Sequence, residues 1–349
     1  MELNINLLNR LCDAFGPTGA EYNVRKIIED ELSAYSSSFD AYTDNLGAYV
    51  VHLEAKDKPK LLISAHMDEV GFMIDEICDD GTLRFSTVGG IVPLVLPAKR
   101  VFAKKPDGSY LHGAIMSKPI HLQSKDERGK VIPSSEMYIS IGADSKEEAE
   151  KCVSLGDLFT FDSSFVEFGN GFIKARALDD RLGCAIMIEV IKALCESEIT
   201  PSYDLYFAFT TREEVGYSGA FAVSEQIHPD YAFVIESTAV GDIHDAPDEK
   251  LVAELGKGGA ISFADRGTIY DRELVNKIID LCKKNEIPYQ MKQYVSGGND
   301  SSNIQRSGFG TRVAVMSAPS RYIHSSSSVV HKDDLNSILN TLYCLVKEV

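Results

Sequence analysis

The sequence of 349 residues contains no tryptophan, and its basic side chains are outnumbered by acidic ones. It has 35 lysines and arginines against 52 aspartates and glutamates, which gives a formal net charge of -17. A nucleic-acid-binding protein needs a basic face to neutralise phosphates, so this charge argues against nucleic acid as a partner. The absence of tryptophan removes an aromatic platform on which sugars often stack in carbohydrate sites.

The seven cysteines do not form a Cys-x-x-Cys pair, and the chain lacks long apolar runs. Scattered cysteines within mostly apolar segments predict reduced thiols in a cytoplasmic protein. We find no basic leader followed by an apolar core at the N-terminus, and no run approaches the length that spans a bilayer. We therefore expect no secretion signal and no membrane partner.

Helix-like and strand-like segments alternate in two parts of the chain. Helical periodicity over 21–34 precedes apolar runs at 48–53 and 60–65, and the alternation resumes near residue 172. This pattern predicts an α/β fold with a mixed, mostly parallel sheet covered on both faces, and with its chemistry at the carboxyl ends of strands. The final helix, at 335–346, is expected to be capped by Asp333 or Asp334.

The segment between these two parts has a different texture. From about residue 71, short strand-like runs are separated by glycine, proline and aspartate turns, which is typical of a small β-barrel or sandwich. We interpret it as an insertion, residues 69–163, into a discontinuous α/β domain of residues 1–68 and 164–349. One continuous mixed sheet is the alternative.

Histidines and carboxylates follow the apolar runs, and one acidic pair precedes a long helix. Adjacent glutamates at a strand end point in different directions, so one can bind a metal while the other handles protons. Two histidines with several carboxylates suit a pair of divalent ions such as zinc, cobalt or manganese, and an aspartate is a suitable shared ligand. The residues in these positions are His66, Asp68, Asp179, Asp180, Glu213, Glu214, Glu236 and His324.

Each of these residues also has an ordinary explanation. Asp179 and Asp180 could simply cap the helix that follows, and His66 could be a hydrogen-bonded core histidine. Glu213 and Glu214 alone would most simply form a solvated acidic turn. Their repeated occurrence at strand ends is what favours a metal site.

Five motifs together resemble one family of enzymes. They are Ala65-His66-Met67-Asp68-Glu69-Val70-Gly71, Ala177-Leu178-Asp179-Asp180-Arg181, Glu213-Glu214-Val215-Gly216, Leu255-Gly256-Lys257-Gly258 and Arg321-Tyr322-Ile323-His324-Ser325. In their order and spacing the sequence is similar, over essentially its entire length, to the metallopeptidase family 42 aminopeptidases, also called glutamyl, deblocking or tetrahedral aminopeptidases.

The resemblance implies a role for each metal-site residue. Asp179 would bridge two metal ions, with His66 and Glu236 completing one site and Glu214 and His324 the other. Asp68 would orient His66 through its other ring nitrogen. Glu213 would be the general base and then the general acid.

The resemblance also implies a fold and an assembly. It predicts an α/β/α zinc-peptidase-like domain with an inserted β-barrel that forms dimers, which assemble into a hollow tetrahedral dodecamer. The implied activity is the release of N-terminal amino acids from peptides, with two divalent ions per subunit, zinc or cobalt first and manganese next.

The sequence departs from the family pattern at one ligand position and in one loop. Glu236 stands where the family commonly has aspartate, which leaves a carboxylate but lengthens its reach by one methylene. The segment 297–301 is similar to a loop that lines the family's substrate pocket, but Asn299 and Ser301 differ from the common residues. The metal that is preferred and the side chain accepted at the cleaved end therefore stay open.

Other functions remain as alternatives at this point. A glycoside hydrolase also uses paired carboxylates, and some relatives carry an endoglucanase label, but the histidines would then have no role. A non-catalytic peptide-binding or assembly protein would be expected to lack a ligand or the base, whereas every expected position here has a competent side chain. A deacylase or carboxypeptidase on a related fold is the last alternative.

Overall fold

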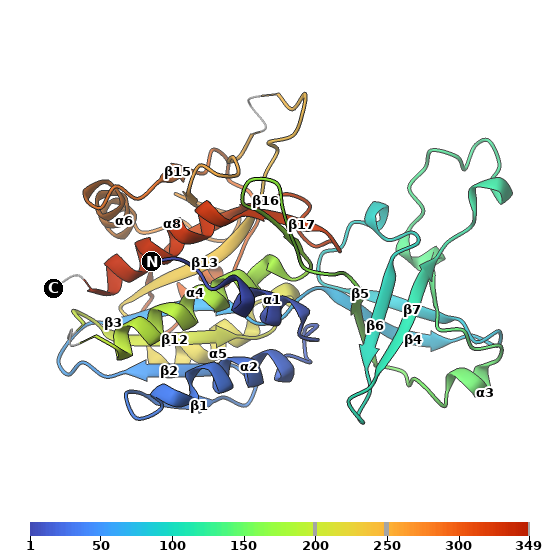
Figure 1. Cartoon of the computed structure of the whole chain (residues 1–349), viewed down its shortest axis with the longest axis horizontal. Helices are drawn as coiled ribbons and strands as arrows, with labels where there is room; N and C mark the ends of the chain where they lie inside the picture. Colours follow the sequence, from blue (N-terminus) through green and yellow to red (C-terminus); the bar gives the residue numbers. More distant parts are fainter. Residues whose placement is uncertain (198–200, 248–250, 348–349) are drawn as a thin grey trace.

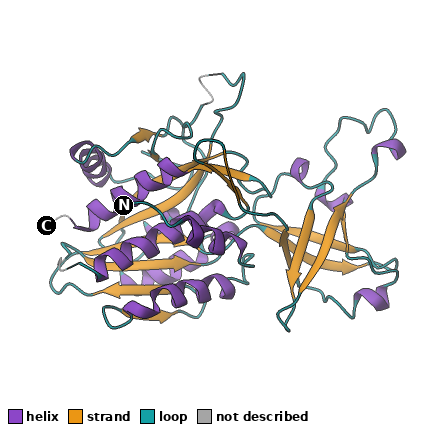
Figure 2. Ribbon diagram, viewed as in Figure 1, coloured by secondary structure: helices purple, strands orange, loops and turns teal. Residues whose placement is uncertain are grey.

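The computed structural model describes residues 1–197, 201–247 and 251–347. An α/β domain built on an eight-stranded sheet lies beside a closed six-stranded barrel, and the two bodies are distinct in Figures 1 and 2. The prediction of an α/β fold with a mixed sheet and an inserted β-barrel is therefore confirmed.

The main sheet has a parallel centre and antiparallel pairs nearer its edges. Its order is β1 (Asp40–Thr43), β2 (Tyr49–Leu53), β12 (Asp204–Thr210), β3 (Lys60–His66), β13 (Tyr231–Ala239), β16 (Arg312–Ser320), β14 (Gly259–Ile261) and β15 (Tyr289–Met291). The four strands from β12 to β16 run parallel. They are almost entirely buried, as expected of strands that are covered on both faces.

The strand β3 is the point where the chain changes direction across the sheet. The connection from β3 leads to β12 on one side, and the next connection leads from β12 to β13 on the other side. Because such connections are right-handed, crossovers in opposite directions lie on opposite faces of the sheet. The carboxyl end of β3 is therefore a switch point, where α/β folds commonly bind ligands.

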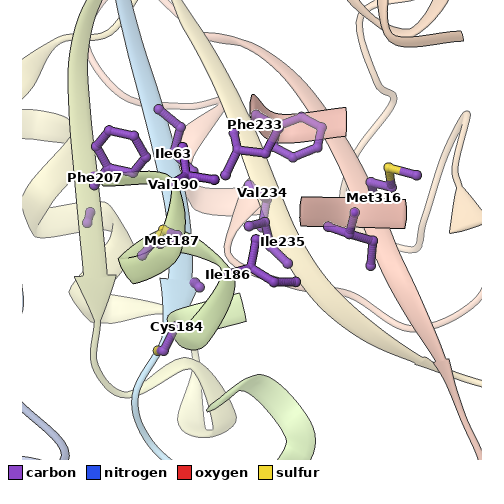
Figure 3. Close-up of a cluster of buried hydrophobic side chains, with 14 of the residues drawn as sticks. Ile63, Cys184, Ile186, Met187, Val190, Phe207, Phe233, Val234, Ile235 and Met316 are labelled. Atoms are coloured by element: carbon purple, nitrogen blue, oxygen red, sulfur yellow. The ribbon is translucent and has the colours of Figure 1, made fainter. Parts of the chain in front are cut away.

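Helices cover both faces of the sheet. They are α1 (Ile5–Asp13), α2 (Tyr22–Leu32), α4 (Leu178–Cys195), α5 (Ser218–Ile227), α6 (Arg272–Lys284), the short α7 (Ser301–Ile304) and α8 (Lys332–Lys347). The helix α4 packs on β3 and β13 with α8 beside it, and α5 packs on β12. Figure 3 shows the core between α4 and the sheet, where Ile186, Met187 and Val190 lie near Ile63 and Phe233.

The prediction that Asp333 or Asp334 caps the last helix is wrong. The helix α8 begins at Lys332, so both aspartates lie inside its first turn. The buried carboxylate of Asp334 instead accepts hydrogen bonds from the backbone N–H groups of Gly256 and Gly258, each at 2.7 Å. It therefore holds the loop that leads into β14, a contact across the sequence that a local capping rule does not predict.

The barrel has its own hydrophobic core. Its strands follow the order β4 (Gly71–Ile77), β5 (Leu83–Val88), β8 (Tyr138–Ser140), β7 (Tyr110–Met116), β6 (Arg100–Lys104) and β9 (Leu158–Phe161), and β9 pairs with β4 to close it. Inside, Phe72 packs edge-to-face on Phe85 and Phe161.

The remaining elements are α3 (Lys146–Ala149), a small sheet of β10 (Val166–Phe168), β11 (Phe172–Ala175) and β17 (Ser328–His331), and the 3-10 turns η1 (Ser33–Tyr35), η2 (Pro93–Val95), η3 (Ile120–Leu122), η4 (Ser134–Glu136) and η5 (Glu213–Val215).

Among the described helices, none is long and apolar enough to cross a bilayer.

A buried ion-pair cluster joins the barrel to the α/β domain. Glu69, between β3 and β4, forms an ion pair with Arg176, and the Arg181 guanidinium lies 3.4 Å from the same carboxylate. Thr160 of the barrel strand β9 donates its hydroxyl to Glu69 at 2.9 Å. Side chains from both bodies thus converge on one carboxylate, whose side chain is 3 % exposed.

We expect Glu69→Gln to destabilise the fold by about 3–5 kcal/mol, because it leaves two buried guanidinium groups without their shared negative charge. The measurement is the midpoint of urea unfolding. Glu127→Gln is the matched control, because Glu127 forms its ion pair, with Lys118, at the surface. The unfolding midpoint of this variant should hardly differ from that of the wild type. Equal midpoints for the two variants would contradict this role of Glu69.

Candidate metal centre

Three neighbouring strands bring the predicted residues to one edge of the sheet. His66 is the last residue of β3 and lies opposite Thr210, the last residue of β12. The turn η5 after β12 carries Glu213 and Glu214. On the other side of β3, Val234 pairs with Ser64, and Glu236 and His66 each lie two residues further on. The central strand and its two neighbours therefore direct their functional side chains to one place.

The acidic pair in the first turn of α4 divides its work between the helix and the site. Asp180 Oδ1 accepts a hydrogen bond from the backbone N–H of Gly183 at 3.1 Å, which satisfies the first turn of the helix. Asp179 precedes it across a cis peptide bond, and its carboxylate lies among the histidines. One residue thus acts as a helix cap while its neighbour is free for the site.

The two carboxylate oxygens of Asp179 face two different imidazoles. Asp179 Oδ1 lies 3.4 Å from His66 Nε2, and Oδ2 lies 3.1 Å from His324 Nε2. Beyond these, Glu236 Oε1 is 4.0 Å from His66 Nε2, and Glu214 Oε1 is 3.2 Å from His324 Nε2. The arrangement has one histidine and one glutamate on each side of a central aspartate.

The other nitrogen of each imidazole is held from outside the site. His66 Nδ1 lies 3.0 Å from the backbone oxygen of Asp68 and 3.4 Å from its carboxylate. His324 Nδ1 lies 2.8 Å from the carbonyl oxygen of Gly90, in the inserted segment. Protons on the two Nδ1 atoms leave both Nε2 atoms as electron-pair donors toward Asp179, which is the usual way in which metal-binding histidines are oriented.

The Asp68 carboxylate also fixes the turn that carries the two glutamates. It accepts hydrogen bonds from the Thr18 hydroxyl at 2.7 Å and from the backbone N–H groups of Glu213 and Glu214 at 3.1 and 3.3 Å. Burial raises the pKa of Asp68, but His66, the Thr18 hydroxyl and the backbone N–H of Glu213 outweigh this effect and hold the pKa below its usual range. Asp68 therefore stays charged and links β3 to the turn η5.

Several buried polar atoms of the cluster have no hydrogen-bond partner in the described chain: His66 Nε2, Asp179 Oδ1 and Glu214 Oε1. Buried acceptors without partners are costly unless a ligand satisfies them. Ligand atoms of His66, Asp179 and Glu214 lie within 4.8 Å of one another, and so do those of His66, Glu213 and Glu236. Imidazole nitrogens and carboxylate oxygens at this spacing fit divalent ions of the zinc class.

The charges of the cluster also favour the binding of cations. Burial, followed by the negative charge of Asp179, raises the pKa of Glu214 to about 8. Burial and like-charge repulsion raise the pKa of Glu213 and of Glu236 as well. Burial lowers the pKa of His324, but Asp179 and Glu214 outweigh this effect and raise it to about 9. Positive charge between these groups would stabilise the ionised carboxylates.

The geometry does not by itself divide the work between Glu213 and Glu214. Both carboxylates lie close enough to His66 to share an ion with it. Which of them binds metal and which moves protons therefore stays a prediction, and so do the roles of Asp68, Asp179, Glu236 and His324.

A cavity of about 820 Å³ opens from the cluster. Asp179, Glu213, Glu236 and His324 line one part of it. The segment that we predicted to line the pocket does so through Gly297, Gly298 and Asn299. Ser301 is buried and does not line the cavity, and its backbone N–H donates to the side-chain oxygen of Asn299. The cluster is thus reached through a pocket large enough for an amino-acid side chain and part of a peptide.

Sequence reasoning missed other residues of this cavity. Asp265 follows β14, and Lys292 directly follows β15, but these strands are three residues each and give too little periodicity to be recognised. The signal that located His66 and Glu213, a polar residue after an apolar run, is therefore present at Lys292 in a weaker form.

Comparisons with known proteins agree with this geometry. The sequence profile of the family described as M42 glutamyl aminopeptidase matches residues 47–340. A lysyl aminopeptidase of Pyrococcus furiosus is 29% identical over 98% of this chain and 96% of its own length. The crystal structure of a TET aminopeptidase from a marine sediment Thaumarchaeota archaeon superimposes with a TM-score of 0.94, at 32% identity, over 99% of this chain and 96% of that one.

Two further structures bear on assembly and on the alternative activity. The Pyrococcus horikoshii TET1 peptidase, which can assemble into a tetrahedron or a large octahedral shell, is 34% identical with a TM-score of 0.87 over 99% of both chains. A Thermotoga maritima protein described as an endoglucanase is 35% identical with a TM-score of 0.78 over 97% of this chain and 96% of that one. Both the peptidase and the endoglucanase descriptions that we expected thus occur among similar structures.

Proposed function

This chain belongs to the M42 glutamyl aminopeptidase family, and from that premise we propose that it releases N-terminal amino acids from peptides with the help of two divalent metal ions. The observation that carries the proposal is the central aspartate, Asp179, whose two oxygens face His66 on one side and His324 on the other. A glycoside hydrolase needs two carboxylates but no such pair of imidazoles. No feature of the described cavity favours that alternative.

The residues of the cluster fit two ions. His66, Asp179 and Glu236 would hold one ion, and Asp179, Glu214 and His324 the other, with zinc, cobalt or manganese as the candidates. Two such ions supply Lewis acidity, which lowers the pKa of water and polarises a carbonyl. The longer reach of Glu236 compared with aspartate suits its position, because its Oε1 is the more distant partner, 4.0 Å from His66 Nε2.

In this proposal Glu213 moves the proton. The residue is 8 % exposed and borders the cavity, and its backbone N–H donates to the Asp68 carboxylate, which fixes the turn that carries Glu213 beside the cavity. Glu213 would accept the proton of the attacking water and return it to the nitrogen of the leaving amine. Because burial raises the pKa of Glu213, its carboxylate is a stronger base than an exposed glutamate.

We further propose that residues 69–163 form a dimerisation domain, as the assembly of the P. horikoshii relative suggests. Exposed apolar side chains occur along this segment at Leu94, Ile120 and Leu122, each at least 61% exposed. A tetrahedral dodecamer of such dimers would admit peptides or unfolded segments. The seven free cysteines suit a cytoplasmic location.

The test is a panel of aminoacyl reporter substrates, with free and with blocked amines, assayed with added zinc, cobalt or manganese and with a chelator. We expect release from free-amine substrates alone, loss of activity with the chelator, and recovery on adding metal back. Hydrolysis of cellulose that survives the chelator, without any peptidase activity, would overturn the proposal.

A further inference from the structure

The family does not determine which N-terminal residue this chain accepts. The family description names glutamyl substrates, whereas the P. furiosus relative is named a lysyl aminopeptidase. The two names require opposite charges in the pocket that receives the substrate side chain. The charges of this chain's own cavity can decide between them.

Lys292 is one of three lysine and arginine side chains that line the cavity opening from the metal cluster. Its Nζ donates one hydrogen bond, to the carbonyl oxygen of Ser296 at 2.9 Å, and forms no ion pair with any carboxylate of the described chain. An ammonium group has three N–H donors, so two are left for a ligand. Burial lowers the pKa of Lys292, while the charges of Asp265 and Glu236 oppose this effect.

The carboxylate of Asp265, in contrast, is already occupied. Its Oδ1 accepts the backbone N–H groups of Gly267 and Thr268, each at 2.7 Å, and its Oδ2 accepts the Tyr270 hydroxyl and the Asn299 amide. These four bonds hold the loop after β14 in place. A substrate ammonium group would have to displace them to reach Asp265, so this residue is a poor acceptor for a lysyl side chain.

Two arginines add positive charge to the same cavity. Arg266 and Arg306 line its wall, and both side chains are exposed. The carboxylates at the other end, Asp179, Glu213, Glu214 and Glu236, are those that two divalent ions would neutralise. With the ions bound, the other charged side chains that line the cavity are three cations, Lys292, Arg266 and Arg306, against the one carboxylate of Asp265, which leaves an excess of positive charge.

From this distribution we propose that the cavity selects peptides with an acidic N-terminal residue, glutamate or aspartate, and that Lys292 is the specificity-determining residue. The side-chain carboxylate would accept the two unused N–H donors of Lys292, with the arginines adding attraction at longer range. This inference rests on the proposed aminopeptidase function, because it assumes that the N-terminal residue occupies the cavity.

The experiment compares Glu and Gln reporters, which have nearly the same shape and differ in charge. In the wild-type holoenzyme we expect kcat/KM to favour Glu by on the order of 10- to 100-fold, the size of a hydrogen bond to a charged group, and to disfavour Lys further. Lys292→Met should bring the Glu/Gln ratio close to one, mainly by raising KM for Glu, and Lys292→Glu should favour Lys over Glu. Metal content is measured for each variant, to show that both ions are retained.

Lys174→Met is the matched control, because Lys174 Nζ also donates to a backbone carbonyl, that of Ser164, but outside the cavity. Its Glu/Gln ratio should equal that of the wild type. Cleavage of free-amine reporters without a preference for Glu over Gln in the wild type would overturn the inference and leave the proposed function intact. An unchanged ratio in Lys292→Met would exclude Lys292 as its source, whereas no cleavage of any free-amine reporter would overturn the proposed function itself.

Discussion

Replacing Glu213 with glutamine should lower kcat by about 10²–10⁴-fold while both metal ions stay bound. Glutamine keeps the shape of the side chain and its place beside the cavity, but it cannot accept the proton of the attacking water. The backbone N–H of Glu213, which holds Asp68, is unaffected by the change. Steady-state kinetics and elemental analysis of the same preparation check both halves of the prediction.

Glu214→Gln provides the contrast to that experiment, because the two glutamates are neighbours in one turn. As Glu214 Oε1 is buried without a hydrogen-bond partner and faces His324, its loss should lower metal content before anything else. Activity of this variant should recover in part at high metal concentration, whereas that of Glu213→Gln should not. A Glu213→Gln enzyme that keeps both ions and wild-type turnover would disprove the assignment.

Asp179→Asn should weaken the binding of both ions together, by at least about 100-fold. Removing a residue that only hydrogen-bonds to a metal ligand already costs up to about 100-fold in affinity, and Asp179 is proposed as a ligand itself. The reason is the symmetry of its contacts, since each carboxylate oxygen faces a different imidazole. Asparagine replaces one of the two oxygens with an NH₂ group, which cannot serve as a ligand and lowers the negative charge between the ions. Activity should fall with the metal content.

The measurement is calorimetric titration of the metal-free protein, with the thermal midpoint recorded before and after metal is added. His324→Ala is the control, because His324 belongs to one side of Asp179 and its loss should leave one ion bound. If the Asp179→Asn protein still bound two ions with wild-type affinity, Asp179 would not be the bridge between them.

The centre of the sheet was predictable because its strands are long apolar runs. Burial on both faces makes most residues of β3, β12, β13 and β16 apolar. Such apolar runs can be recognised as strands without knowing which strands pair with them. β14 and the edge strand β15 are three residues each, and they are strands because of the partners they pair with. The barrel strand β8, also of three residues, is likewise too short to show a strand pattern of its own.

The same distinction separates the site residues that sequence reasoning found from those it did not. His66 and Glu213 follow long strands, and the spacing of their motifs carried the prediction. Lys292 follows a strand that the sequence does not reveal, and the buried Asp334 acts on glycines about 80 residues earlier in the chain. Contacts of this kind become visible only when the chain is folded.

The hydrogen bond between His324 and the carbonyl oxygen of Gly90 couples the barrel to the metal centre. Gly90 belongs to the inserted segment and His324 to the α/β domain, so the ring that faces Asp179 keeps its orientation as long as the two bodies keep theirs. By thermodynamic reciprocity, whatever fixes the barrel against the sheet strengthens metal binding, and bound metal in turn rigidifies the joint between them. In an assembly that joins subunits through their barrels, as we propose, these contacts would reach the proposed metal ions, and assembly and metal loading would form one coupled equilibrium.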